Sequence, residues 1–315
     1  MLSLLSLVNC SNSSSADDST PKTQLDPLDA TPRLLIMSAF DAEMDELLNE
    51  ADITNSYTIK GSICRTGKLA GNDVVMVLCG ISMISATLTT QAVIDHFEIT
   101  GIVFSGIAGG VNPNLHIGDV TVPKQWAQYQ EQLFAKKISD TEWDSAGHEV
   151  KLLEPVVNFG MMYPKHVVIT QQYETEDINE YKLWFEADPA MLDTARKIAD
   201  FIDLNDCTPE GVCLENDPEI ILDGNGVSGQ TFVNNAEYRE WVWNSFQADA
   251  LDMETAAVAH VAYVNEVPYI AFRSVSDLAG GGPGENELGT FFQLAANNSS
   301  MVLMKFLEEW ADLQD

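Results

Sequence analysis

The chain has 315 residues, of which 45% are hydrophobic, so it can bury a full core as one large domain or two small ones. Asp and Glu number 48 against 16 Lys and Arg, a formal net charge of −32. Such a surface repels polyanions, so neither nucleic acid nor anionic membrane is expected as a partner. A saline habitat or simple solubility would explain the same excess of acid. No run reaches the roughly 18 to 20 apolar residues of a membrane-spanning helix.

The first 32 residues differ in character from the rest of the chain. A short apolar run ends at Cys10, and a polar tract rich in Ser, Asp, Thr and Pro follows to about Pro32. This resembles the end of a bacterial lipoprotein signal with Cys10 as the lipid-modified residue, although a basic first segment is absent and Asn9 is unusual before the cysteine. A frayed apolar N-terminus is the alternative. We expect an extracytoplasmic protein, periplasmic or lipid-anchored, with its folded domain at 33–315.

Strands and helices are predicted to alternate along that domain. Continuous apolar runs predict strands at residues 33–38, 101–105, 119–123 and 268–273, and a hairpin over 60–80. Helices are predicted from Asp41, over 82–96 and 236–246, from Met253, and over 291–313. The spacing Ser38-x-x-Asp41 is typical of a capping box. The alternation predicts a mostly parallel sheet covered on both faces. Residues 124–223 lose a clear period and are interpreted as an insertion.

Cysteines other than Cys10 fit an oxidising compartment. Cys207 and Cys213 flank the turn-rich sequence Thr-Pro-Glu-Gly-Val, and we expect a disulfide to close this loop.

The hairpin over 60–80 carries the other two cysteines. If Leu69 pairs with Val74, counting outward along the two strands places Cys64 opposite Cys79. Cross-strand neighbours can be bonded or merely packed, so both interpretations stay open for this pair.

Four segments contain residue types suited to cleavage of an N-glycosidic bond. They are Ser38-Ala-Phe-Asp-Ala-Glu43, Ser105-Gly-Ile-Ala-Gly-Gly110 with Gly118-Asp119-Val, Asp252-Met-Glu254, and Arg273-Ser-Val-Ser-Asp277. Their order and spacing resemble the 5′-methylthioadenosine/S-adenosylhomocysteine nucleosidases of the nucleoside phosphorylase superfamily, from Arg33 to the C-terminus. The insertion, the Cys207/Cys213 loop and the Asp277–Gly282 ending look closest to the secreted plant branch, which includes bark and vegetative storage proteins. The resemblance implies a three-layer α/β/α sandwich with a mixed central sheet, a homodimer and no cofactor.

Such a reaction needs an acid at the departing base, an activated nucleophile at C1′ and a partner for a sugar that becomes cationic. The resemblance implies that Asp277 protonates the purine N7 and that Glu43 activates the attacking water. Glu254 would accept hydrogen bonds from the ribose hydroxyls, and Met253 would pack on the sugar. Each carboxylate also has a plainer interpretation, because Asp277 could cap its loop and the glutamates lie in first helical turns, where acids favour the dipole.

The remaining substrate contacts follow from the same resemblance. Residues 228–234 match the family's purine pocket, where Phe232 would stack on the base and the Val233 backbone would read its edge. Phe40 would line the far end, near the 5′ substituent, although an apolar residue there also suits simple packing. The other expected contacts are Ala108, Gly109 and Ser276.

Arginine usage bears on the choice between water and phosphate as the nucleophile. Phosphorolytic relatives place an arginine just before the glycine-rich segment to hold phosphate, and that position here is Phe104. This favours water, because arginine is the preferred bidentate phosphate ligand. A phosphate clamp built by Arg65 or a neighbouring subunit stays open. No metal is expected, since the five histidines show no paired ligand spacing.

The sequence thus predicts a nucleosidase that releases the free base from methylthioadenosine, S-adenosylhomocysteine or a related purine nucleoside. The alternatives are a phosphate-dependent purine nucleoside phosphorylase on the same scaffold and a non-catalytic nucleoside-binding or storage protein.

Overall fold

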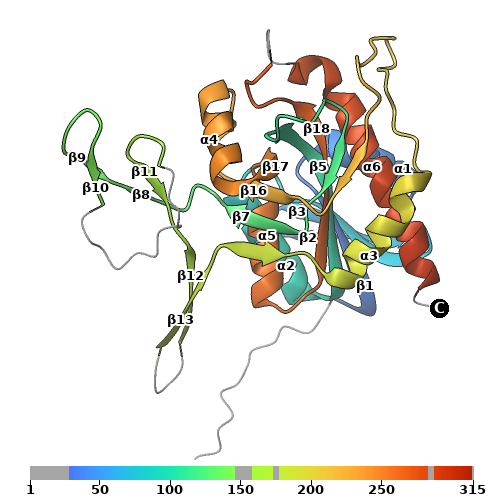
Figure 1. The fold of residues 1–315 in the computed structure, drawn as a ribbon. Helices are drawn as coiled ribbons and strands as arrows, with labels where there is room; N and C mark the ends of the chain where they lie inside the picture. Colours follow the sequence, from blue (N-terminus) through green and yellow to red (C-terminus); the bar gives the residue numbers. More distant parts are fainter. Residues whose placement is uncertain (1–27, 146–157, 173–176, 283–286, 314–315) are drawn as a thin grey trace, which may run out of the picture.

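A computed structural model describes residues 28–145, 158–172, 177–282 and 287–313 (Figure 1). Cys10 and most of the expected leader lie outside the described residues, so its lipidation stays a prediction. The first strand begins at Asp29, before the predicted start of the domain at residue 33.

A large mixed sheet forms the centre of the molecule. Twelve strands of the described chain belong to it: β1 (Asp29–Ser38), β2 (Asp52–Ile59), β3 (Ser62–Leu69), β4 (Asn72–Leu78), β5 (Phe97–Gly110), β6 (Val120–Val122), β7 (Gln125–Gln128), β14 (Trp184–Glu186), β15 (Ile220–Leu222), β16 (Asn225–Ser228), β17 (Ala248–Asp252) and β18 (Tyr269–Asp277). β1 lies parallel to β4 and β5, and β5 lies parallel to β18. β2, β3 and β4 pair antiparallel, as do β17 and β5.

Helices cover both faces of this sheet (Figure 1). They are α1 (Asp41–Glu50), α2 (Met83–His96), α3 (Pro189–Ile198), α4 (Ala236–Phe246), α5 (Thr255–Val264) and α6 (Leu288–Asp312), with a 3₁₀ turn, η1, at Ala199–Phe201. α2 packs beside α5, whereas α1 and α3 pack against α6. All nine residues of β18 are buried, as expected for a central strand covered on both faces. Polar side chains needed for chemistry therefore lie at the strand ends.

The start of α1 differs from the predicted capping box. The N-cap residue is Phe40, and Ser38 is the last residue of β1. Its hydroxyl donates to the Glu43 carbonyl at 3.3 Å and leaves the helix start uncapped. The Glu43 carboxylate instead accepts from the Ala39 amide at 2.7 Å. The prediction was wrong because Ser38 stays paired within the sheet, opposite Leu78.

The hairpin of β3 and β4 has a different register from the one expected. Residues Ala70 and Gly71 form a two-residue turn with φ angles of 44° and 83°, which suits a tight hairpin. Leu69 consequently pairs with Asn72, and the expected pairing with residue 74 is wrong. Cys64 does not face Cys79 in this register, and both thiols are free and buried.

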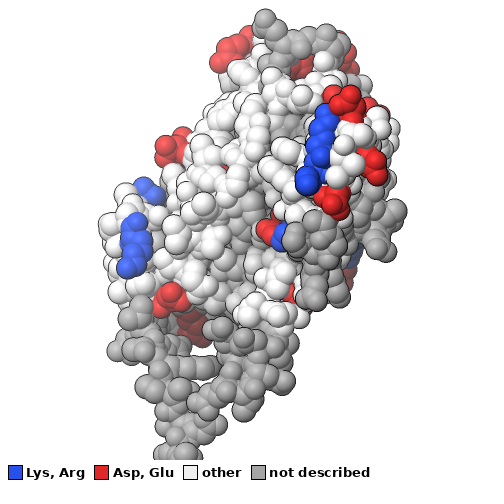
Figure 2. All heavy atoms as spheres, turned by 90° about the vertical axis from the view of Figure 1, so that its left-hand side faces the viewer, with Lys and Arg blue, Asp and Glu red and all other residues white. Residues whose placement is uncertain are grey.

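Only part of the segment 124–223 leaves the main body. β7, β14, β15 and α3 lie within it, and these three strands belong to the central sheet. Between β7 and β14 the chain forms a projecting arm of short strands (Figure 1): β8 (Gln132–Phe134), β9 (Lys136–Lys137), β10 (Trp143–Asp144), β11 (Met162–Pro164), β12 (Val167–Gln172) and β13 (Asp177–Lys182). Charged side chains are sparse on the described part of the face that Figure 2 shows, so the acidic excess is not concentrated there. Further along, Cys207 and Cys213 are joined by a disulfide.

Candidate active site

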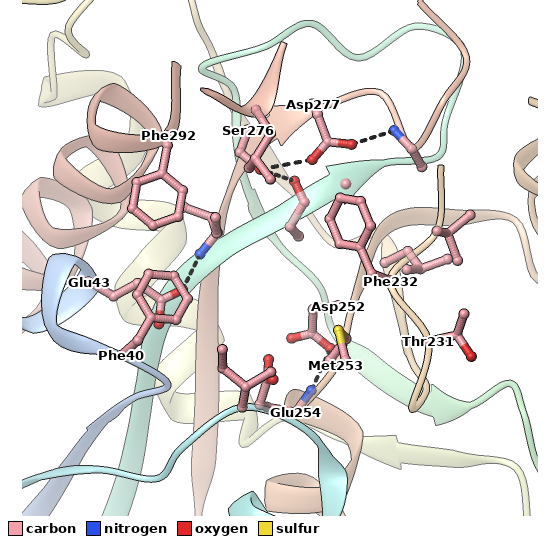
Figure 3. A pocket seen from close by; sticks show the side chains of 18 residues that line it. Phe40, Glu43, Thr231, Phe232, Asp252, Met253, Glu254, Ser276, Asp277 and Phe292 are labelled. Atoms are coloured by element: carbon pink, nitrogen blue, oxygen red, sulfur yellow. Dashed lines mark hydrogen bonds between the residues drawn. The ribbon is translucent and has the colours of Figure 1, made fainter. Parts of the chain in front are cut away.

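A cavity of about 390 Å³ lies where β5, β17 and β18 reach their carboxyl ends (Figure 3). The carboxyl ends of strands are the usual place for a ligand in an open α/β sheet. All ten residues that the sequence nominated for catalysis or substrate binding line this one cavity: Phe40, Glu43, Ala108, Gly109, Phe232, Val233, Met253, Glu254, Ser276 and Asp277. They come from five separate parts of the chain, and the fold brings them together.

Glu43 is held at one side of the cavity by two backbone amides. One carboxylate oxygen accepts from Ala39 at 2.7 Å, and the other accepts from Ile107 at 2.8 Å. Arg273 Nη1 lies 3.7 Å from the second oxygen. Burial raises the pKa of Glu43, while the charge of Arg273 and the amides act in the opposite direction. The side chain is therefore rigidly placed beside a fixed positive charge.

Arg273 is the centre of a buried cluster of charges. Its guanidinium has no exposed surface and lies over the Phe104 ring, 4.1 Å from the centroid. Nη2 is 2.8 Å from Asp252 Oδ2 and 3.9 Å from Glu254 Oε2. Nε donates to the Thr255 hydroxyl at 2.9 Å. The ion pairs with Asp252 and the glutamates lie within contact distance but are poorly aligned as hydrogen bonds, so the cluster is held mainly by charge.

Asp252 and Glu254 lie at the start of α5 but make different contacts. Asp252 accepts from the Thr255 amide at 3.2 Å and from the Ser228 and Thr255 hydroxyls, so it serves as the anchor of the helix start. Glu254 is the N-cap residue, but its side chain makes no cap bond. Instead Glu254 Oε1 accepts from the Ser82 amide at 2.7 Å. Glu254 thus lies at the N-cap position, one residue before the first turn where it was expected, and its carboxylate is bound by a segment distant in sequence.

The pKa of Glu254 is raised to about 7, first by burial and then by the negative charge of Asp252. Arg273 and the Ser82 amide oppose this rise. A carboxyl that titrates near neutrality inside a cavity is typical of a functional site, although buried ion-pair networks also produce such shifts.

Asp277 ends β18 at another side of the cavity. Its Oδ1 accepts from the Ala279 amide at 2.8 Å, so it also caps the loop that follows, as the plainer interpretation predicts. The Ser276 hydroxyl lies 3.1 Å from Asp277 Oδ2 and 3.3 Å from the Ala108 carbonyl oxygen. Arg239 of α4 donates to the Gly110 carbonyl at 2.8 Å; burial lowers the pKa of Arg239, and the nearby Asp277 opposes this fall.

Apolar side chains form the rest of the wall. Phe232 is exposed at the side of the cavity that also carries Thr231, and Phe40 and Phe292 lie at the opposite side (Figure 3). An exposed ring beside a cavity can stack on a flat ligand such as a nucleobase.

The sequence model of the Phosphorylase superfamily matches residues 33–308. The chain belongs to this family. A 5′-methylthioadenosine/S-adenosylhomocysteine nucleosidase of Tolumonas auensis is 26% identical over 275 residues, which are 87% of this chain and 98% of the relative. A nucleosidase of the same name from Bacillus thuringiensis is 23% identical over 279 residues, 88% of this chain and 99% of the relative.

Solved structures of this superfamily share the fold. The 5′-methylthioadenosine/S-adenosylhomocysteine nucleosidase of Neisseria meningitidis, in complex with methylthio-immucillin-A, matches with a TM-score of 0.65 at 21% identity, over 88% of this chain and 99% of that one. Futalosine hydrolase of Helicobacter pylori gives a TM-score of 0.65 at 21% identity, over 88% and 98% of the two chains. The predicted α/β sandwich with a mixed central sheet is therefore confirmed.

Arg273 and Phe292 are two residues of the site to which the sequence analysis gave no role. Arg273 begins the segment Arg273-Ser-Val-Ser-Asp277 named above, but no pattern in a sequence shows that an arginine will be buried among carboxylates. Phe292 reads as one of many apolar residues of a core helix. Arg65, considered as a phosphate ligand, does not line the cavity.

The described residues contain no group of three or more side chains suited to hold a metal ion. None of the described helices has the length and apolar character needed to cross a membrane.

Proposed function

We propose that this chain is a purine nucleosidase that hydrolyses the N-glycosidic bond of methylthioadenosine, S-adenosylhomocysteine or a related purine nucleoside. The observation that carries the proposal is the convergence of Glu43, Glu254 and Asp277, three buried carboxylates, on one mostly apolar cavity. The reaction needs an acid, a base and a partner for a cationic sugar, and carboxylates can supply all three. The relatives named above act on such nucleosides.

In the proposed reaction a water molecule attacks C1′ while the bond between C1′ and the purine nitrogen breaks. The bonding electrons leave with the purine, and Asp277 donates a proton to N7. Glu43 accepts the proton that the water loses. Glu254 accepts hydrogen bonds from the ribose hydroxyls, Met253 packs on the sugar and Phe232 stacks on the base.

Hydrolysis is favoured over phosphorolysis by the surroundings of Arg273. Its guanidinium is enclosed by Glu43, Asp252 and Glu254 and has no exposed surface. These acids neutralise its charge and would repel a phosphate ion. Phe104 fills the neighbouring position with an apolar ring.

A homodimer belongs to the same proposal. Ile81, just before α2, and Ile84 and Leu88 within it are 57%, 64% and 66% exposed, and Ile81 also lines the cavity. An apolar helix face beside a ligand cavity suits contact with a second copy that completes the site. Light scattering should give twice the chain mass, and Leu88→Asp should reduce it to one chain.

An extracytoplasmic location, with Cys10 lipidated, and a place near the secreted plant branch also remain proposals. The disulfide between Cys207 and Cys213 supports an oxidising compartment. Such a location would make the chain a scavenger of external nucleosides. Metabolic labelling with an alkyne fatty acid should mark the full chain and leave Cys10→Ala unmarked; equal labelling would contradict the anchor.

The testing experiment is release of free base from methylthioadenosine, S-adenosylhomocysteine, adenosine, inosine and futalosine, each with and without phosphate. Phosphate-independent release from at least one of them is expected. Release only with phosphate would establish the phosphorylase alternative. No release, together with tight adenine binding, would establish the binding or storage alternative.

A further inference from the structure

The segment between β16 and α4, residues 229–235, carries the proposed base contacts but forms neither helix nor strand. We refer to it as the base loop. Its first amide, that of Gly229, donates to the Asp252 carbonyl at 3.1 Å, and its last residue, Asn235, is the N-cap of α4. The ring of Phe232, between these ends, is 54% exposed. Packing therefore fixes this ring only in part, and its position depends on the backbone of the loop.

A further support of the base loop comes from the turn where the arm leaves the central sheet. Gln130 follows the end of β7 by two residues, and its Oε1 accepts from the Gln230 amide at 2.6 Å. Gln130 Nε2 donates to the Tyr129 hydroxyl at 3.2 Å. Tyr129 is fully buried, so it gives the glutamine a fixed partner. The side chain of Gln130 thus joins the base loop to the core.

The loop and the turn also lie in close contact at Gly229. A Cβ atom at this position would lie 2.5 Å from Gln130 Cδ and 2.6 Å from a ring carbon of Tyr129, so a residue without a side chain is needed there. Val233 packs in the same buried cluster as Tyr129. These contacts hold the base loop on either side of Phe232.

We propose that Gln130 is a positioning residue for the base: it holds the base loop so that Phe232 is placed to stack on a purine. This rests on the proposed nucleosidase function and gives the start of the arm a part in base binding. Gln130 does not line the cavity, so its effect passes through the Gln230 amide. Loss of this bond should leave the proposed acid and base in place, because other amides hold Asp277 and Glu43.

Calorimetric binding of adenine and of hypoxanthine tests this role. Gln130→Met keeps the length of the side chain but removes the acceptor, so the Gln230 amide then donates to water. We expect the Kd of the tighter-binding purine to rise by ~5-fold, the size of one neutral hydrogen bond. Gln130→Glu keeps an acceptor for that amide and should restore most of the affinity.

Kinetics supply a second measurement on the same variants. With a nucleoside that the wild type cleaves, KM should rise by ~5-fold in Gln130→Met while kcat stays within ~2-fold, as expected for an interaction made equally in the ground state and the transition state. Hydrogen exchange of the Gln230 amide should also become faster in this variant, since the amide loses its partner. An unchanged exchange rate or unchanged purine affinity would overturn the inference.

Gln132→Met is the matched control. Gln132 belongs to the same turn and donates to the Tyr129 carbonyl at 3.1 Å, and it does not line the cavity. This variant loses a hydrogen bond of the turn and should keep the purine affinity of the wild type. An equal loss of affinity in the Gln130 and Gln132 variants would mean that both act only through the stability of the turn, which would overturn the inference.

Purine binding needs no bond cleavage, so it separates this inference from the proposed function. If the wild type cleaves no nucleoside, the nucleosidase proposal fails, and weaker purine binding by Gln130→Met alone would still support the inference. If the wild type cleaves a nucleoside and Gln130→Met binds purine as tightly as it does, the inference alone fails. A wild type that neither cleaves a nucleoside nor binds a purine would overturn both.

Discussion

The two proposed catalytic carboxylates lie on two sides of the cavity, and the electrostatic surroundings of the two sides differ. Glu43 lies 3.7 Å from the Arg273 guanidinium, within a buried cluster of charges. Asp277 instead accepts from the Ala279 amide and lies beside the Ser276 hydroxyl. Burial raises the pKa of Glu43, and the fixed cation opposes that rise and so favours the ionised form that a base needs. A hydroxyl can donate to an ionised carboxylate and accept from a protonated one, so it tolerates both states of an acid.

Neighbouring groups can thus give two similar carboxyl groups different proposed roles, base for Glu43 and acid for Asp277. Both Glu43 and Asp277 are buried carboxylates that line the same cavity. Environments that distinguish two carboxyl groups are a recurring means of assigning acid and base within one site. The predictions below change one side at a time.

The largest effect is expected for Asp277→Asn. The amide oxygen can still accept from Ala279, but the side chain has no acidic proton for N7. We expect kcat for base release to fall by ~1,000-fold, within the range for loss of a general acid. The melting temperature should stay close to that of the wild type. A kcat within ten-fold of the wild type would mean that the acid lies elsewhere.

On the other side, Arg273→Met should mainly reduce stability. It leaves Glu43, Asp252 and Glu254 buried without their cation, which should cost ~3–5 kcal/mol of unfolding free energy. Arg196→Met is the matched control, because Arg196 pairs with acids at the exposed surface and its loss should cost ~0–1 kcal/mol. Urea unfolding monitored by tryptophan fluorescence measures both. Equal losses would show that the buried cluster holds no special stability.

The order of the elements was predictable because apolar runs and their periods depend on local sequence. The helix over 236–246 and the strand starting near residue 269 follow directly from such patterns. Registers and strand ends were less predictable. The strand predicted at 101–105 continues through the glycine-rich segment to Gly110, because Gly106 and Gly109 pair with β18. That pairing depends on a strand far away in the sequence.

The sequence motifs predicted which residues form the site, whereas the contacts that hold these residues in place are seen only in the fold. The motifs named residues that prove to share one cavity. Nothing in the sequence showed that Arg273 would be wholly buried or that Phe292 would stack on Phe40. Such contacts join residues hundreds of positions apart, and no local pattern encodes them.

The pH dependence of stability should report on Glu254, which belongs to the buried cluster of charges around Arg273. The pKa of Glu254 is about 7 in the folded chain, against an ordinary value of 4.5. The folded state therefore binds this proton more tightly than the unfolded state does, and stability is gained fully below pH 4.5 and lost as pH rises through 7. Glu254→Gln should flatten the curve between these values by roughly 1–3 kcal/mol. Unfolding by urea at several pH values measures this, and parallel curves for the two proteins would contradict it.

The smallest effect is expected for Ser276→Ala, with Ser274→Ala as its control. Both serines are buried in β18, and each hydroxyl donates to a backbone carbonyl at 3.3 Å: Ser276 to Ala108 and Ser274 to Gly118. Each substitution should therefore destabilise the fold by ~1 kcal/mol. Only Ser276, the chain neighbour of Asp277, also reaches its carboxylate, at 3.1 Å.

The two serine variants should thus differ in activity but have similar stability. We expect kcat/KM to fall by ~3–10-fold in Ser276→Ala, the size of one hydrogen bond, and to stay unchanged in Ser274→Ala. Base release and urea unfolding, measured on both, supply the comparison. An equal loss of activity in the two variants would mean that the contact between Ser276 and Asp277 is incidental, and that the hydroxyl beside this acid does not distinguish it from Glu43.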